Sequence, residues 1–241
     1  MPLPRQLDLP PPFRLVALRE AGDAFAHASA HALEFGAGTL VFVGRFDVAE
    51  FAVVLEPEEA LQNARRGFYA GMAALADALC ALAPPETPIA IDWPDALTVR
   101  RRFVGGGRLA WPAGADEQTI PGWLVFGGVI RAVSMRSGEV ALHPSSTSLA
   151  DEGFGEVGAD RLVEGFARHL MRAIDRWQED DFAAIERSYL ARLPLERGVD
   201  RAIDARGNLQ IERPGEPVSC LDLRAALATP SRLTRSHGGS G

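Results

Sequence analysis

The stretch that decides the fold is IDWPDALTVRRRFVGGGRLA, residues 91–110. Strand-forming residues recur in and around it, at Ile89–Trp93, Leu97–Val99 and Arg108–Trp111, and glycine and proline turns are expected between them. Gly105-Gly106-Gly107 leads into strand residues instead of opening a helix, and the pattern G-x-G-x-x-G is absent. A dinucleotide site or a P-loop, in which glycines open a helix, is therefore excluded.

Further strands are expected on both sides of this stretch. Residues 14–19 are expected to form a short strand, and Thr39–Gly44, Glu50–Leu55 and Trp123–Val133 are rich in β-branched and aromatic residues. Arg45–Ala49 is short enough to be a tight hairpin between two of these strands.

Helical periodicity predicts the remaining large elements. Glu20–Phe35 is alanine-rich and is followed by Gly36. One apolar stripe runs from Leu61 to Leu82 and stops at Pro84-Pro85; a second runs from Leu162 to Trp177, and a third helix is expected at about Asp180–Leu193. A polar loop is expected at residues 142–158, before the helix that carries Leu162–Trp177. Because helices and strands interleave irregularly, the fold class is α+β with a mixed sheet flanked by helices.

The C-terminal part predicts a separate small β module. Pro194–Gly198 has the composition of a linker, and three short strands alternate with turns at 199–204, 209–212 and 218–221. The last residues, 236–241, are expected to be a frayed tail.

The composition bounds the classes of function. The 241 residues carry 25 basic side chains, all of them arginine, against 32 Asp and Glu, which gives a formal charge of −7. This balance argues against nucleic acid as the main partner. The apolar runs are far too short to span a membrane, and the proline-rich start does not resemble a signal peptide, so a cytoplasmic protein is expected. Without lysine, Schiff-base and P-loop lysine chemistry are excluded.

Several short motifs stand in the order found in biotin protein ligases. Trp93-Pro94 matches the W-P of the signature W-P-N-D, and Gly106 matches the glycine that closes it. The other matches are Gly38-Thr-Leu-Val, Val53-Val-Leu-Glu-Pro before a long helix, Val125-Phe-Gly-Gly-Val-Ile-Arg, and Thr147-Ser-Leu. The chain thus resembles the biotin/lipoate protein ligase family over most of its length. A second, weaker resemblance links Arg101-Arg-Phe-Val-Gly-Gly-Gly107 to the R-R-x-S-G-G-G of lipoate ligases.

The resemblance implies a class II biotin/lipoate ligase-like domain at 1–194, a small SH3-like β domain at 195–235, and a tail. It also implies an enzyme that uses ATP and magnesium to adenylate a small carboxylic acid (biotin, lipoate or octanoate) and transfers the acyl group to a carrier protein. The residues that it assigns to the binding site are Arg45, Trp93, Asp95, Arg102, Phe103, Gly105, Gly106 and Arg108.

The sequence differs from the family's motifs at positions whose charge the adenylation reaction needs. Phe103 takes the place of the family's lysine, and the five residues of the predicted hairpin replace a G-R-G-R loop with one arginine, Arg45. Ala21-Gly22-Asp23 stands for S-T-N, and Val129-Ile-Arg131 for G-I-N. Two anions must meet in adenylation, and one donor that stabilises such charge is typically worth about 2.7–4 kcal/mol. Arg102 and Arg108 are the nearest substitutes for the missing lysine.

Other readings of these residues stay open. Trp93 either lines an acyl pocket or packs in the core; Asp95 either faces a magnesium ion or is an ordinary carboxylate at a strand end. His27 and His31 have metal-ligand spacing but no third ligand nearby in sequence, and Cys80 and Cys220 suit neither a disulfide nor a nucleophile. Two functions compete: a divergent acyl-adenylating ligase or acyltransferase, and a non-catalytic ligase-fold binding or scaffold protein.

Overall fold

The computed structural model describes residues 7–19, 22–134, 146–155 and 157–229. A seven-stranded sheet forms its centre, in the order β1-β2-β3-β7-β6-β5-β4. Only the β1–β2 pair is parallel, so the sheet is mixed, as predicted. The strands are β1 (Arg14–Leu18), β2 (Thr39–Val43), β3 (Val48–Leu55), β4 (Ile89–Asp92), β5 (Ala96–Val99), β6 (Arg102–Ala110) and β7 (Leu124–Arg131).

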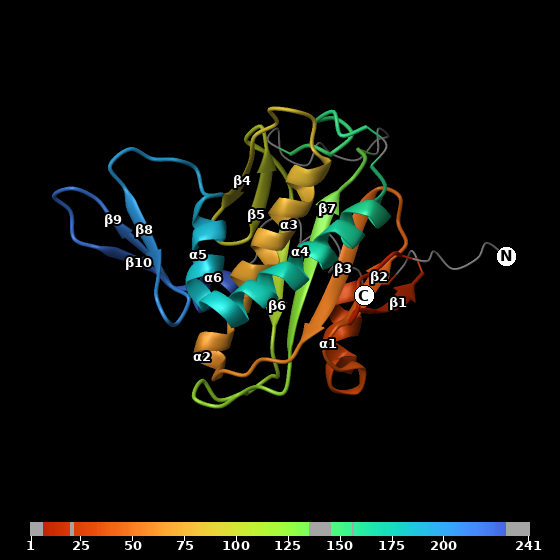
Figure 1. Ribbon diagram of the computed structural model, residues 1–241, viewed down its shortest axis with the longest axis horizontal. Helices are drawn as coiled ribbons and strands as arrows, with labels where there is room; N and C mark the ends of the chain where they lie inside the picture. Colours follow the sequence, from red (N-terminus) through yellow and green to blue (C-terminus); the bar gives the residue numbers. More distant parts are fainter. Residues whose placement is uncertain (1–6, 20–21, 135–145, 156, 230–241) are drawn as a thin grey trace.

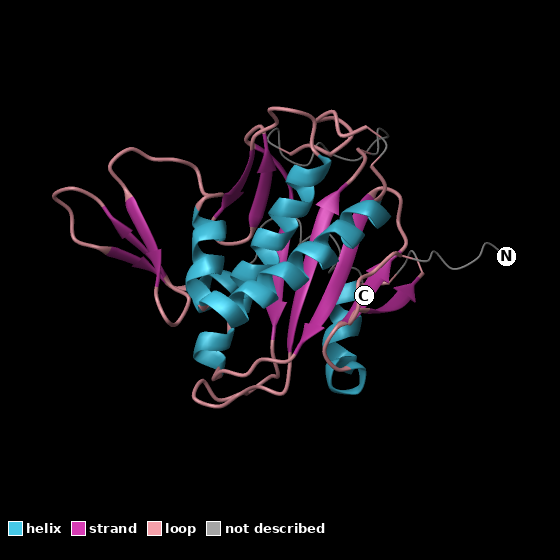
Figure 2. Ribbon diagram, in the orientation of Figure 1, coloured by secondary structure: helices cyan, strands magenta, loops and turns pink. Residues whose placement is uncertain are grey.

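Helices cover both faces of this sheet (Figures 1 and 2). Helix α1 (Ala24–Phe35) lies on one face, where Ala24, Ala28 and Ala32 repeat every four residues and pack against β2, β3 and β7. Helices α3 (Gly67–Leu82), α4 (Ala159–Asp180) and α5 (Phe182–Leu190) lie on the other face, over a larger core of aromatic and aliphatic residues. No helix in the described ranges has the length and hydropathy needed to cross a bilayer.

Two expectations about local structure are wrong. The apolar stripe of 61–82 is not one helix, because α2 (Leu61–Ala64) is separated from α3 at Arg65 and Arg66. Arg65 is 5% exposed, forms a two-pronged ion pair with Glu117 at 2.9 and 2.6 Å, and lies over Trp111. The ion pair of Arg65 therefore fixes the backbone between the end of α2 and the start of α3.

The triple glycine does not form a turn between strands but lies within β6. A Cβ on Gly106 would come within 2.0 Å of the Asp95 carbonyl oxygen, which also accepts the N–H of Gly107 at 3.0 Å. A Cβ on Gly107 would meet Met72 and Phe126 at less than 3.0 Å. Glycine is therefore required here by close packing, which local sequence does not reveal.

The C-terminal module is a three-stranded antiparallel sheet of β8 (Asp200–Ile203), β9 (Leu209–Glu212) and β10 (Ser219–Leu221), followed by α6 (Leu223–Leu227). The short helix α6 was not expected. The β8–β9 turn docks on α3, where the Tyr69 hydroxyl donates to the Gly207 carbonyl at 2.6 Å. The module therefore lies beside α5 at the edge of the larger domain (Figure 1). The predicted tail lies outside the described residues, as does part of the 142–158 loop.

Candidate ligand site at one end of the sheet

The positions at which the chain departs from the ligase motifs meet at one end of the central sheet. The 44–47 hairpin joins β2 to β3, and Val48 at the start of β3 pairs with Arg131 at the end of β7. Phe103 lies near the start of β6, two residues before Gly105, which pairs with Ile130. Antiparallel pairing thus brings together segments that are far apart in the sequence, and α1 begins beside them.

Glu50 and Asp23 hold the N-terminus of α1. Glu50 of β3, only 7% exposed, accepts the backbone N–H of Ala24 at 3.0 Å. Asp23 caps the helix by accepting the N–H of Ala26 at 2.8 Å. Carboxylates are favoured at this position by the helix dipole and by the unpaired N–H groups of the first turn. Two backbone N–H groups in the first turn of α1 therefore donate to carboxylates of the same chain.

Arg108 and Phe25 cover the α1 face of the sheet next to these carboxylates. Arg108 forms an ion pair with Asp23 at 3.2 Å, and its guanidinium lies 4.2 Å from the centre of the Phe25 ring. Phe25 in turn fills the space above Gly127, where a Cβ would come within 2.5 Å of the ring. Burial lowers the pKa of Arg108, and Asp23 and Glu50 oppose that shift. This part of the sheet surface is occupied by protein side chains.

Arg102 is bound to a buried acid. Glu152 is 4% exposed and accepts hydrogen bonds from Arg102 at 3.1 Å and from the Thr147 hydroxyl at 2.9 Å. Arg100 lies 3.5 Å from the same carboxylate. The arginine run and the Thr147-Ser-Leu motif therefore share one acid. Sequence reasoning missed this acid because Glu152 lies fifty residues from Arg102.

Arg45 folds back on its own hairpin, where its guanidinium binds Asp47 through two hydrogen bonds of 3.1 and 2.9 Å. Arg131 lies at the end of β7, opposite the start of β3. It is half-buried, and within the described ranges no ion pair joins it to a carboxylate. Val125 and Gly127 of β7 face α1, so strand alternation places Arg131 on that same face.

Trp93 and Asp95 lie on the way from β4 to β5. Trp93 packs against the core below α3, and its indole N–H donates to the Tyr69 hydroxyl at 3.2 Å. Asp95 is 5% exposed. Gly105 and Gly106 form part of the floor of β6, and Phe103 is half-buried. Phe103, Gly105, Gly106 and Arg108 thus lie on β6, and Arg45 lies in the β2–β3 hairpin, with β3 separated from β6 by β7. Trp93 instead faces the core on the α3 side.

The histidines and cysteines form no metal centre in the described part of the chain. His27 and His31 stack on α1 with ring centroids 4.4 Å apart, and His31 Nδ1 lies 2.9 Å from the His27 carbonyl oxygen. Cys80 is half-buried beside Arg192, and burial raises its thiol pKa.

This arrangement of a mixed sheet, two helical layers and a small β module defines a protein of the biotin-ligase fold. Among solved structures, a biotin protein ligase-like protein of unknown function from a Silicibacter species matches with a TM-score of 0.78 and 28% identity, over 91% of this chain and 98% of that one. Biotin protein ligase from Aquifex aeolicus matches with a TM-score of 0.67 and 14% identity, over 87% and 95%. The Leishmania major enzyme matches with a TM-score of 0.53 and 14% identity, over 88% and 99%.

The model of the biotin/lipoate A/B protein ligase family matches residues 9–191, which is most of the chain. The protein belongs to this family. A search of curated proteins found no match. The family and the fold expected from the W-P and T-S-L motifs are therefore confirmed, while the roles of individual site residues remain predictions.

Proposed function

We propose that the protein is a ligase-fold binding protein that no longer carries out ordinary biotin adenylation. One observation carries this proposal: three arginines near the site, which are candidate substitutes for the family's cations, are paired with acids of the same chain. These pairs are Arg45–Asp47, Arg102–Glu152 and Arg108–Asp23.

The physical argument concerns the meeting of two anions. Adenylation brings a carboxylate against a triphosphate, and fixed cations must offset their repulsion in the transition state. An arginine already bound to a carboxylate has little positive potential left to offer, and releasing it costs the energy of its existing pair. Phe103, at the lysine place, contributes no charge. The described side chains therefore supply little of the electrostatic support that this reaction needs.

ATP and magnesium, which the resemblance implies, are a poor fit to the described residues. Magnesium in ATP sites is usually held by one or two carboxylates together with the substrate phosphates. Asp95, the predicted magnesium contact, is only 5% exposed, so its carboxylate is almost closed to an ion from solvent.

A second function, an acyl-adenylating ligase or acyltransferase that acts on a carrier protein, is favoured by Arg131. Its guanidinium has no ion pair in the described ranges, and Arg131 shares the α1 face of the sheet with Arg108. A solved structure of the Aquifex aeolicus enzyme contains biotin and ATP. In this reading, Arg131 binds the carboxylate of biotin, lipoate or octanoate in place of a lysine. We also propose a cytoplasmic location, which fits both functions.

Calorimetry and a turnover assay separate the two functions. Titrations with biotin, lipoate, octanoate and ATP, each to millimolar concentration, measure binding, and release of pyrophosphate in the presence of each acid measures adenylation. We expect no pyrophosphate release above background, with the Aquifex aeolicus enzyme as positive control. Acid-dependent release would overturn the binding-protein proposal, whereas failure of every acid and of ATP to bind would exclude the ligase.

A further inference from the structure

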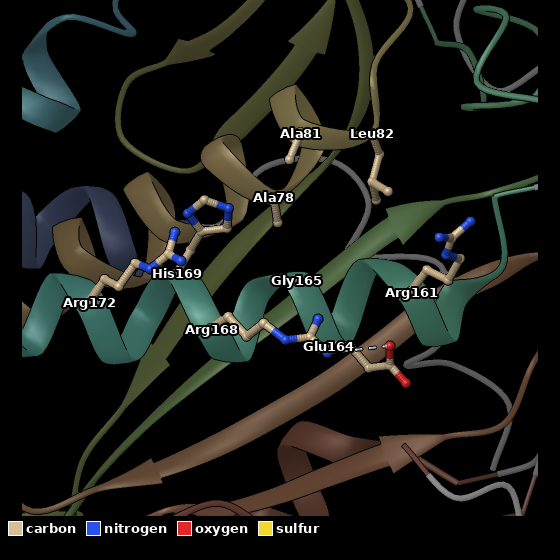
Figure 3. A pocket seen from close by; sticks show the side chains of 9 residues that line it. All are labelled: Ala78, Ala81, Leu82, Arg161, Glu164, Gly165, Arg168, His169 and Arg172. Carbon is tan, nitrogen blue, oxygen red and sulfur yellow. Dashed lines mark ion pairs between the residues drawn. The ribbon is translucent and has the colours of Figure 1, made fainter. Parts of the chain in front are cut away.

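A basic groove lies on the outer surface between α3 and α4, away from the ligand site. Its larger part has a volume of about 340 Å³, and a second part of about 160 Å³ continues along α4. Small residues form the floor, among them Ala74, Ala78 and Gly165, and both parts share His169 and Arg172 (Figure 3). The two parts therefore form one groove that follows the helix.

Arginines of α4 line this groove at helical spacing. They are Arg161, Arg168, Arg172 and Arg176. Arg168 is paired with Asp8 and lies near Glu164, but within the described ranges no ion pair engages the other three. Burial lowers the pKa of His169, which disfavours its charged form, while Asp77 of the same groove opposes that shift. A groove with three unengaged arginines stands out on a protein whose formal charge is −7.

The spacing of the arginines matches an extended peptide. Arg168, Arg172 and Arg176 are four residues apart, and a rise of about 1.5 Å per residue places them at intervals of about 6 Å. Alternate side chains of an extended strand are about 6.6 Å apart and point the same way. From Arg161 to Arg176 the helix rises about 22 Å, a length that roughly seven extended residues cover.

The N-terminal segment of this chain already makes one such contact. Asp8 binds Arg168 through its carboxylate at 2.8 Å, and its carbonyl oxygen accepts from the same guanidinium at 3.1 Å. The N–H of Asp8 donates to Glu164 at 2.8 Å. Arg168 and Glu164 thus already hold one acidic residue and its backbone on α4, and Arg172 and Arg176 continue the positive charge along the groove.

We propose that the α3–α4 groove binds an extended acidic segment of a partner protein, with carboxylates at alternate positions facing Arg172, Arg176 and Arg161. The small residues of the floor let the peptide backbone approach α3, and the arginine forks bind carboxylates along the rim. This surface is separate from the ligand site, so the proposal does not depend on whether acyl chemistry occurs there.

The test is fluorescence anisotropy with a labelled eight-residue peptide of alternating aspartate and alanine. Measurements at about 0.01 M salt, where the Debye length is roughly 30 Å, favour detection, and repetition at 0.15 M tests the ionic contribution. We expect Arg172→Gln with Arg176→Gln to weaken binding about tenfold. The matched control is Arg19→Gln with Arg197→Gln, which removes the same charge from exposed positions outside the groove and should change binding less than twofold.

Two comparison ligands make the result decisive. A peptide of the same composition with its aspartates in one block should bind more weakly, because its carboxylates do not match the arginine spacing. Equal binding of both peptides, equal weakening by both variant pairs, or no binding at low salt would overturn the proposal. Tighter binding of a single-stranded RNA, lost in the groove variant, would also overturn it in favour of nucleic acid.

Discussion

Replacement of Glu152 by glutamine tests whether paired arginines are what keeps anions from the ligand site. Glu152 is almost fully buried and accepts from Arg102 at 3.1 Å and from Thr147 at 2.9 Å, with Arg100 at 3.5 Å. Glutamine keeps the shape and one acceptor oxygen but removes the charge. The side chains of Arg100 and Arg102 are 49% exposed, so water can hydrate them after the change.

The expected cost to stability is about 2 kcal/mol. Hydrogen bonds to a charged group are worth ~1.5–3 kcal/mol and neutral ones ~0.5–1.5, so losing the charge weakens each bond by about 1 kcal/mol. The larger penalty for breaking a buried ion pair, ~3–5 kcal/mol, does not apply because the buried member becomes neutral. Urea denaturation measures this cost as a lower transition midpoint.

The same variant should bind anions more strongly at the sheet end. Two released arginines, each worth up to ~1 kcal/mol in an exposed pair, predict about a tenfold tighter association with tripolyphosphate, measured by calorimetry. Glu117→Gln is the matched control, because it removes one charge from an acid paired with Arg65 and Arg224 outside this region. If both variants bind tripolyphosphate equally, or neither gains affinity, the reasoning from paired arginines is wrong.

Three further predictions follow from single contacts. The pKa of Glu117 is lowered, chiefly by its hydrogen bond to Arg65. Its contribution to stability is therefore present above about pH 4.5 and is lost as the pH falls through the lower pKa of the folded state. The urea midpoints of wild type and Glu117→Gln should converge on acidification. Gly106→Ala should cost on the order of 3 kcal/mol, since its Cβ meets the Asp95 carbonyl at 2.0 Å, whereas Gly165→Ala, with its nearest contact at 3.5 Å, should be neutral or stabilising in thermal unfolding. Phe103→Lys should strengthen octanoate binding about tenfold in calorimetry, and Phe103→Met, which adds no charge, should not.

The elements most accessible to sequence reasoning were those set by local periodicity. The alanines of α1, the apolar stripes of α3 and α4, and the hairpin between β2 and β3 follow from residue spacing and are confirmed. The β6 glycines were misjudged because their requirement comes from the Asp95 carbonyl and the Phe126 ring, which tertiary packing brings close. Glycine weakens a strand when judged from local sequence alone, and only the close packing around β6 explains why glycine stands there.

The candidate site likewise has a part that the sequence predicts and a part that only tertiary packing reveals. The W-P and glycine motifs lie in or beside the central sheet, but the sequence did not reveal which charged groups pair there. Glu50 reaches the start of α1 across twenty-six residues, and Glu152 reaches Arg102 across fifty. Such contacts are decided by how strands are ordered in the sheet, and that order is not encoded in any single motif.

The absence of lysine gives these pairs a physical reason. An arginine fork binds a carboxylate through two parallel hydrogen bonds, as Arg65 does with Glu117 and Arg45 with Asp47, whereas a lysine ammonium is a point charge with looser geometry. Replacing lysine by arginine throughout a chain with 32 acids therefore favours internal pairs over free cations. Phe103 is the exception, because exchange of lysine for arginine would have kept a charge at that position. The loss there, together with the paired arginines near it, supports the proposed loss of adenylation, which a change of composition alone would not explain.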